Sequence, residues 1–287
     1  MTPYSPTLRG RRLGTALRRL RADAGLSSSH VASQVGWSPS KISRIEGGQM
    51  TVSPGDVREL LAVYKVAGPE AEALVALARQ VRQRGWWHQY NEIMPEWFQA
   101  YVSMEAEASR ICIFELGAVP DLLQTADYTA AVIDAQPQPR TPDEQDVMVG
   151  LWQTRRNRLT ADPAMQLDVI IAEGALRQHV GGPAVMRAQL DHLAEAAALP
   201  NIVIRVLPFS AGAHPAMTSG AFSVLEFSEP DDPRTVYTAQ LTGGSYLEIL
   251  REVGTYRLAY EQLRVASLGP EDSAEFISRL AGELTAP

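Results

Sequence analysis

The sequence predicts an all-α N-terminal domain of five helices, followed by an α+β domain with a small sheet backed by helices. The 287 residues, 45% of them apolar, are enough for two hydrophobic cores. Residues 1–85 hold 13 Lys and Arg against 6 Asp and Glu, a net charge of +7, whereas the remaining residues hold 13 against 27, a net charge of −14. The expected bounds are 1–84 for the first domain, 85–100 for a linker and 101–287 for the second domain.

A stripe of leucines at helical spacing predicts the first helix, over residues 11–24, which Gly25 ends. Its members are Leu13, Leu17 and Leu20. The serines at 27–29 supply an N-cap for a second helix, because a serine oxygen accepts from the free amides of the first turn. Gly36 ends that helix in a turn that needs a residue tolerant of positive φ.

A third helix is expected after Ser38, with Pro39 at its first position, where the missing proline N–H costs nothing. Ile42 and Ile45 point to the core, so the rest of the helix surface is polar and cationic. That surface consists of Ser40, Lys41, Ser43 and Arg44. Two more helices complete the domain, one after Ser53 and one from Pro69 to about Arg84.

A short cationic helix of this kind fits the major groove of DNA. Arg44 can bind guanine O6 and N7 with both arms of its guanidinium, while Ser40 and Ser43 can bond base edges or phosphates. Lys41 is the expected phosphate contact. The net positive charge of the first 85 residues favours the same partner, because cations that neutralise phosphates release counterions.

The segment LRRLRADAGLSSSHVASQVGWSPSKISRIEGGQ, residues 17–49, resembles the Xre or lambda-repressor-like helix-turn-helix family. The resemblance implies a buried ion pair between Arg21 and Glu46. It also implies a phosphate contact at the start of the second helix, where Ser28 replaces the glutamine common in the family. The expected DNA-binding residues are therefore Ser28, Ser38, Ser40, Lys41, Ser43 and Arg44.

Alternating strands and helices predict the α+β domain. Strands are expected over ICIFEL at 111–116 and at 167–172, 202–207, 221–227 and 235–240. Helices are expected from a capping box at Thr141 and Glu144, and over 183–198, 246–267 and 270–284. We interpret Arg155, Arg156 and Arg158 as a solvated face, and the aromatic residues near 86–101 as a seam between domains.

Residues 101–280 resemble the companion domain of unknown function found behind Xre-type modules in actinobacterial, antitoxin-like regulators. The matching segments include VPDLLQT at 119–125, IIAEGALRQHVGG at 170–182 and PNIVIRVLP at 200–208. Asp121 stands where glycine is usual in this family. The resemblance implies a small partner protein, commonly the product of the adjacent gene.

Catalytic signatures are missing from the sequence. There is no phosphate-binding or dinucleotide glycine motif and no H-E-x-x-H, and the single Cys112 cannot build a thiolate zinc site. We therefore expect no enzyme activity, no cofactor and no metal. Polar residues that follow the strand at 167–172, with a histidine of a later loop, are possible ligand contacts, although for Glu173 we favour the interpretation that it caps the next helix. They are Glu173, Arg177, His179 and His214.

The sequence predicts a cytoplasmic, homodimeric regulator of transcription that binds a palindromic operator in double-stranded DNA, without a membrane segment. Its C-terminal domain is expected to sense a ligand or a small partner protein. One alternative is an antitoxin that neutralises the neighbouring gene's product and autoregulates its operon. Another is an enzyme tethered to DNA, which rests only on Glu173, His179 and His214.

Overall fold

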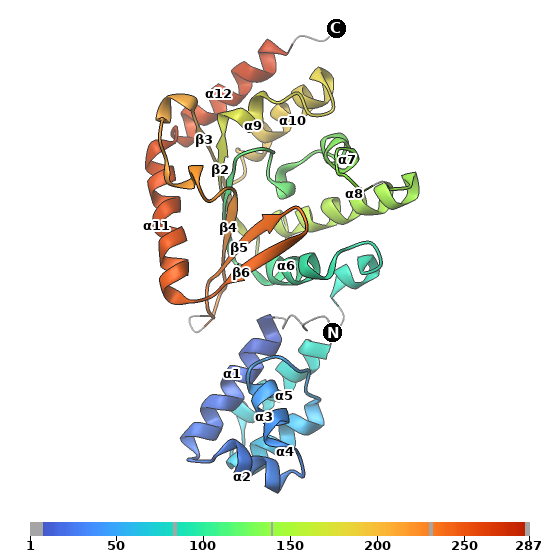
Figure 1. Cartoon of the computed structure of the whole chain (residues 1–287), viewed down its shortest axis with the longest axis vertical. Coiled ribbons are helices and arrows are strands. Elements are labelled where there is room, and N and C mark those ends of the chain that lie inside the picture. The colour runs from blue at the N-terminus through green and yellow to red at the C-terminus, as the bar shows by residue number, and fades with distance from the viewer. Residues whose placement is uncertain (1–7, 83–84, 139, 230–231, 285–287) are drawn as a thin grey trace. The chain divides into compact units, whose positions relative to one another are not determined.

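The computed structural model describes residues 8–82, 85–138, 140–229 and 232–284, and the chain divides into two compact units (Figure 1). The N-terminal unit comprises residues 1–91 with 99–104, and the C-terminal unit comprises 92–98 with 105–287. The first is helical and the second is α+β, so the predicted fold class is confirmed.

Five α-helices of the N-terminal unit begin and end close to the predicted positions. They are α1 (Leu8–Asp23), α2 (Ser28–Gln34), α3 (Pro39–Glu46), α4 (Pro54–Tyr64) and α5 (Pro69–Arg82). Serine side chains cap three of them: Ser27 accepts from His30 N, Ser38 accepts from Lys41 N, and Ser53 forms a reciprocal capping box with Asp56. These caps satisfy amides that have no partner within the helix.

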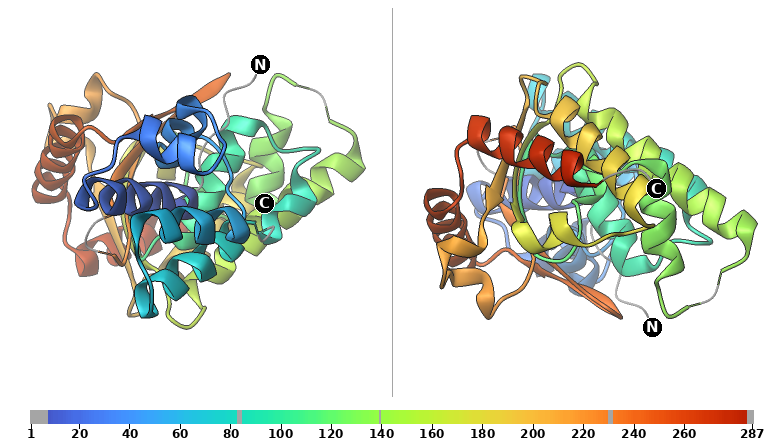
Figure 2. Two further views of the ribbon diagram at one scale, coloured as in Figure 1. Left: turned by 90° about the horizontal axis from the view of Figure 1, so that it is seen from below. Right: turned by 90° about the horizontal axis from the view of Figure 1, so that it is seen from above.

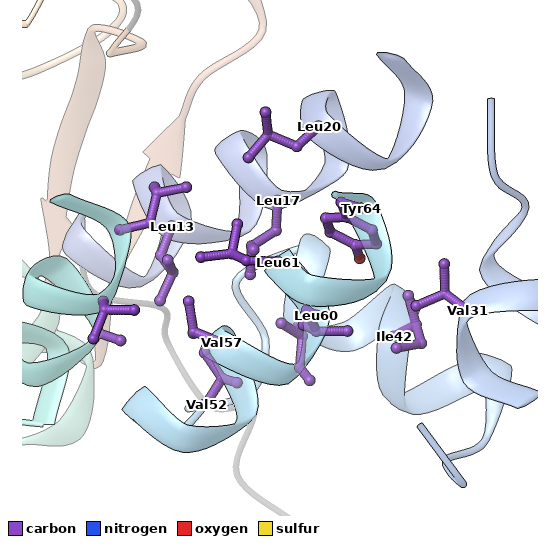
Figure 3. Packing of buried hydrophobic residues seen from close by; sticks show 14 of the residues in the cluster. Leu13, Leu17, Leu20, Val31, Ile42, Val52, Val57, Leu60, Leu61 and Tyr64 are labelled. Carbon is purple, nitrogen blue, oxygen red and sulfur yellow. The ribbon is translucent and has the colours of Figure 1, made fainter. Parts of the chain in front are cut away.

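The core of this unit is built from one face of each helix (Figure 3). Leu13 and Leu17 of α1 lie against Leu61 of α4, while Val31 of α2 lies beside Ile42 of α3. Each fully buried side chain of this size contributes about 1.5–3 kcal/mol. Burial therefore stabilises α2 and α3, because isolated helices of seven or eight residues are marginal in water.

A six-stranded sheet forms the centre of the C-terminal unit, in the order β3-β2-β1-β4-β5-β6. Its strands are β1 (Arg110–Glu115), β2 (Gln166–Ala172), β3 (Ile202–Leu207), β4 (Phe222–Glu226), β5 (Thr235–Gln240) and β6 (Gly243–Leu247). The first three are parallel, and the remaining neighbours pair antiparallel. The parallel strands are apolar runs because helices cover both faces of the sheet.

Three helices lie on one face of the sheet, namely α7 (Ala126–Asp134), α8 (Pro142–Arg156) and α10 (Pro183–Ala196), and α11 (Leu250–Ala266) covers the other (Figures 1 and 2). Cys112 and Phe114 pack toward α11, and burial raises the pKa of the Cys112 thiol to about 12, so it packs as a small apolar group.

The remaining helical elements are η1 (Trp86–Tyr90), α6 (Glu96–Glu107), η2 (Asp121–Leu123), η3 (Asn157–Leu159), α9 (Glu173–Arg177), η4 (Phe209–Ala211), η5 (Pro215–Met217) and α12 (Pro270–Glu283). None of the helices described is long and apolar enough to cross a membrane.

The helix predicted over residues 246–267 starts later than expected. Residues 243–247 form β6 instead, and α11 begins only at Leu250. The segment Gly243-Gly244-Ser245 carries no β-branched residue, so strand propensity does not reveal it. It becomes a strand because it pairs antiparallel with β5.

The interpretation of the arginines at the end of α8 as a solvated face is wrong for Arg155, which is 1% exposed. Its guanidinium donates to both carboxylate oxygens of Glu105 at 2.7 Å and to Asp121 Oδ2 at 3.0 Å. Asp121 thus supplies a second carboxylate to a buried cation. Two carboxylates offset the desolvation of that charge.

Candidate nucleic-acid interface

The turn between α2 and α3 presents α3 at the surface of the N-terminal unit. Val31 and Ala32 of α2 are 0% and 1% exposed, and the small Ala32 lets α3 cross closely. Gly36 adopts φ +67°, a conformation that glycine reaches without strain. Trp37 N donates to Ala32 O at 2.8 Å and closes the turn.

On α3, Ile42 and Ile45 are buried, while Ser40, Ser43 and Arg44 are exposed. Within the described ranges, the Arg44 side chain forms no hydrogen bond or ion pair. Its five donors are therefore available to an external acceptor. The arrangement is the one that base readout in a groove requires.

Two other expected DNA contacts already have partners in the structure. The Ser38 hydroxyl accepts from Lys41 N at 3.2 Å, so it caps α3. The Lys41 ammonium lies 3.4 Å above the Trp37 ring. A surface cation–π contact contributes only about 0.5–1 kcal/mol. It therefore orients the Lys41 ammonium but leaves it able to bind a phosphate.

Ser28 and Ser43 line one hollow of about 290 Å³ between α1, α2 and the end of α3. Arg18 and Gln49 line it too, although they were not among the expected DNA-binding residues. Both side chains bear hydrogen-bond donors. A signal for Arg18 was present in the sequence, since it lies off the leucine stripe of α1, whereas Gln49 follows the helix and shows no periodicity.

An ion pair ties α1 to the end of α3. Arg21 Nε and Nη2 donate to the two carboxylate oxygens of Glu46 at 2.6 and 2.8 Å, and Arg21 Nη1 donates to Leu26 O at 2.8 Å. The side chains are 17% and 7% exposed. The hydrogen bond to Glu46 raises the pKa of Arg21 above its ordinary value. The pair therefore fixes the angle at which α3 leaves the core.

Gly14 is required where α1 crosses the end of α3. A Cβ atom there would lie 2.5 Å from Ile45 O and 2.8 Å from Glu46 O, which are backbone atoms that cannot move aside. We expect Gly14→Ala to destabilise the N-terminal unit by about 1–3 kcal/mol, the usual cost of overpacking. Hydrogen exchange of α1 and α3 amides in the full chain measures this.

Gly55→Ala is the matched control, because its Cβ would meet only Ser53 Oγ at 3.6 Å in the first turn of α4. That change should be neutral or stabilising, since alanine is the better helix former. Equal protection of α1 and α3 in wild type and Gly14→Ala would contradict the close crossing.

The possible ligand contacts of the C-terminal unit do not all come together. Glu173 is buried and accepts from Phe209 N at 2.8 Å and from Arg177 Nε at 2.7 Å. His179 is exposed, and the half-buried His214 ring lies edge-on to Phe114. In the described ranges neither histidine contacts Glu173, whose hydrogen bonds connect α9 to the segment after β3.

The described residues contain no group of three or more His, Cys, Asp or Glu side chains that could hold a metal ion. His192 Nδ1 and Glu195 Oε2, which share a helix face of α10, lie 4.0 Å apart.

Two family models match the chain. One, described as a helix-turn-helix domain, matches residues 12–74 and so covers most of α1, all of α2 to α4 and the start of α5. The other, described as Domain of unknown function (DUF5753), matches residues 98–279, more than half of the chain and all six strands. No curated protein matches the chain.

Proposed function

The chain belongs to the DUF5753 family and carries a helix-turn-helix domain, and we propose that it is a sequence-specific DNA-binding regulator of transcription of the Xre type. One observation carries the proposal: α3 presents Ser40, Ser43 and Arg44 outward, while its isoleucines and the Arg21–Glu46 pair fix its orientation. A footprint on a DNA site selected by the protein tests it, because both half-sites of a palindrome should be protected.

We assign two kinds of contact to the DNA. Arg44 reads a guanine, and Ser40 and Ser43 bond base edges or phosphates. Lys41, with the hollow that contains Ser28, binds the backbone and sets the register. The net charge of +7 in residues 1–85 favours the approach to phosphates, while the acidic remainder limits indiscriminate adhesion.

The C-terminal unit, in this proposal, receives a signal from a ligand or a small partner protein, and the chain acts in the cytoplasm by binding rather than by catalysis. The antitoxin alternative of the actinobacterial group makes a different prediction. An antitoxin would co-purify with the product of its neighbouring gene, and expression of that product alone would arrest growth. Unrestricted growth would dismiss the alternative.

Dimerisation is part of the proposal, because one helix-turn-helix buries too little surface for specific binding. The exposed stripe of α11 suits a second copy. Its apolar members, Leu250, Leu258 and Val265, are 86%, 62% and 79% exposed, and Gly254 lies between the first two. An antiparallel pair of α11 helices would set Leu258 of each copy over Gly254 of the other. Such an interface is self-complementary, as two-fold symmetry requires.

Leu258→Glu should convert the dimer to a monomer, because it places two carboxylates in an apolar contact. Sedimentation equilibrium of the full chain gives the mass directly, with twice the chain mass expected for wild type. Val147→Glu on α8, across the sheet from α11, is the control and should stay dimeric. A dimer that persists in Leu258→Glu would place the interface elsewhere.

A further inference from the structure

A cavity of about 460 Å³ opens in the C-terminal unit between α8, η3, α10 and the start of β3. It lies near the amino end of β3, whereas Glu173 follows the carboxyl end of β2. Its volume is within the range of small-molecule sites. The apolar part of its wall consists of Leu122, Leu123, Leu159, Ala196, Leu199 and Ile202.

Arg156 brings a positive charge to this wall. The one carboxylate on the described wall, that of Glu195, is 82% exposed and lies 4.0 Å from His192 Nδ1 instead of forming an ion pair with Arg156. Its guanidinium donates only to neutral acceptors: Gln153 Oε1 at 2.8 Å, Gln124 O at 3.2 Å and His192 Nε2 at 3.1 Å. No ion pair to Arg156 is present in the described part of the chain. Burial lowers the pKa of Arg156, with no carboxylate to oppose the effect.

Arg155, which precedes Arg156 on α8, differs from it in having counter-ions. Arg155 has Glu105 and Asp121 as counter-ions, so its charge is matched within the fold. Arg156 is half-buried on the cavity side of the same helix, and a desolvated cation is stable only when an anion or several acceptors face it. The missing negative charge is therefore one that an external group can supply.

Gln153 adds a second donor to the same wall. Its Nε2 is buried and has no hydrogen-bond partner, while its Oε1 is taken by Arg156. Buried donors are normally paired, so an unpaired amide beside a cavity indicates an acceptor that is external to the fold. His192 is not expected to add a second positive charge beside Arg156, because burial and the neighbouring Arg156 lower its pKa.

We propose that this cavity binds a small organic anion, with one carboxylate on Arg156 and Gln153 and an apolar body against the leucines. The inference deepens the proposed function, since such a molecule is the signal that the C-terminal unit receives. Arg156 and the Gln153 amide favour an anion over an amine, and the apolar wall favours an organic body over a bare inorganic anion.

Calorimetric titration of the full chain with decanoate and with naphthalene-2-carboxylate tests the proposal. At least one of the two should bind saturably, one per chain. The matched alcohol, decan-1-ol or naphthalene-2-methanol, keeps the apolar body without the charge and should bind at least about ten-fold more weakly. Absence of saturable binding by both acids, or equal affinity for acid and alcohol, overturns the assignment.

Variants locate the site. Arg156→Gln should lose about ten-fold or more in affinity, and Thr160→Trp, a change at an exposed position of the rim, should block binding with Arg156 intact. Arg187→Gln, on the exposed side of α10, is the control and should bind as wild type does. Wild-type affinity in both Arg156→Gln and Thr160→Trp places any binding outside this cavity and contradicts the proposal.

The same preparations, mixed with selected DNA, separate this inference from the proposed function. Sequence-specific DNA binding without carboxylate binding would refute the cavity site alone. Carboxylate binding without any DNA sequence preference would refute the regulator alone.

Discussion

Glu46→Ala should destabilise the N-terminal unit by about 3 kcal/mol, because it leaves the Arg21 guanidinium partly buried without its counter-ion. Breaking a buried pair costs about 3–5 kcal/mol. The lower end applies here, since Arg21 stays 17% exposed and keeps its bond to Leu26 O. The loss falls on the α1–α3 contact that orients the DNA-facing helix.

Hydrogen exchange of α1 and α3 in the full chain reports this loss by local opening, without assuming that both units unfold together. Glu70→Ala is the matched control. Its partner is Arg19 at 2.9 Å, but the two side chains are 52% and 60% exposed, and exposed pairs contribute about 0–1 kcal/mol. The same small effect for both substitutions would mean that the Arg21–Glu46 pair does not stabilise the fold.

Arg44→Ala should weaken binding to the selected DNA site by about 1–3 kcal/mol and relax discrimination at one base pair of each half-site. The physical reason is the fixed fork of donors, which matches guanine O6 and N7 but no other base edge. Arg44 is exposed on α3, so its removal leaves the core intact. Binding to a panel of single-base variants of the site, at fixed salt, measures both effects.

Lys41→Ala separates base readout from charge. It should weaken binding to all sequences similarly and lower the slope of log affinity against log salt by about one. If Arg44→Ala instead lost the same free energy on every variant of the site, Arg44 would be a phosphate contact and the base reader would have to be sought elsewhere on α3.

Much of the N-terminal fold could be predicted because its signals are local. Ser38 and Pro39 start α3, and Gly36 breaks the chain where positive φ is needed. The leucine stripe of α1 is visible at helical spacing. In the C-terminal unit the apolar runs of β1 to β5 were visible for the same reason.

Features that depend on distant partners were not visible. Strand β6 exists because β5 pairs with it, and Arg155 is buried because Glu105 and Asp121 surround it. Arg155, Arg156 and Arg158 look alike in the sequence. Arg155 is nevertheless buried in the core, and Arg156 lines a cavity. Nor does periodicity show that Gln49 reaches the hollow of Ser28 and Ser43.

We propose that the outward surface of α3 reads DNA sequence. Selection of duplexes from a random library by the full chain, at moderate salt, tests it most directly. We expect enrichment of one motif with two inverted half-sites about 34–36 Å apart. With the Arg44→Ala variant, the preference for one base pair of each half-site should be lost. Recovery of unrelated sequences, with no preference above the starting library, would contradict it.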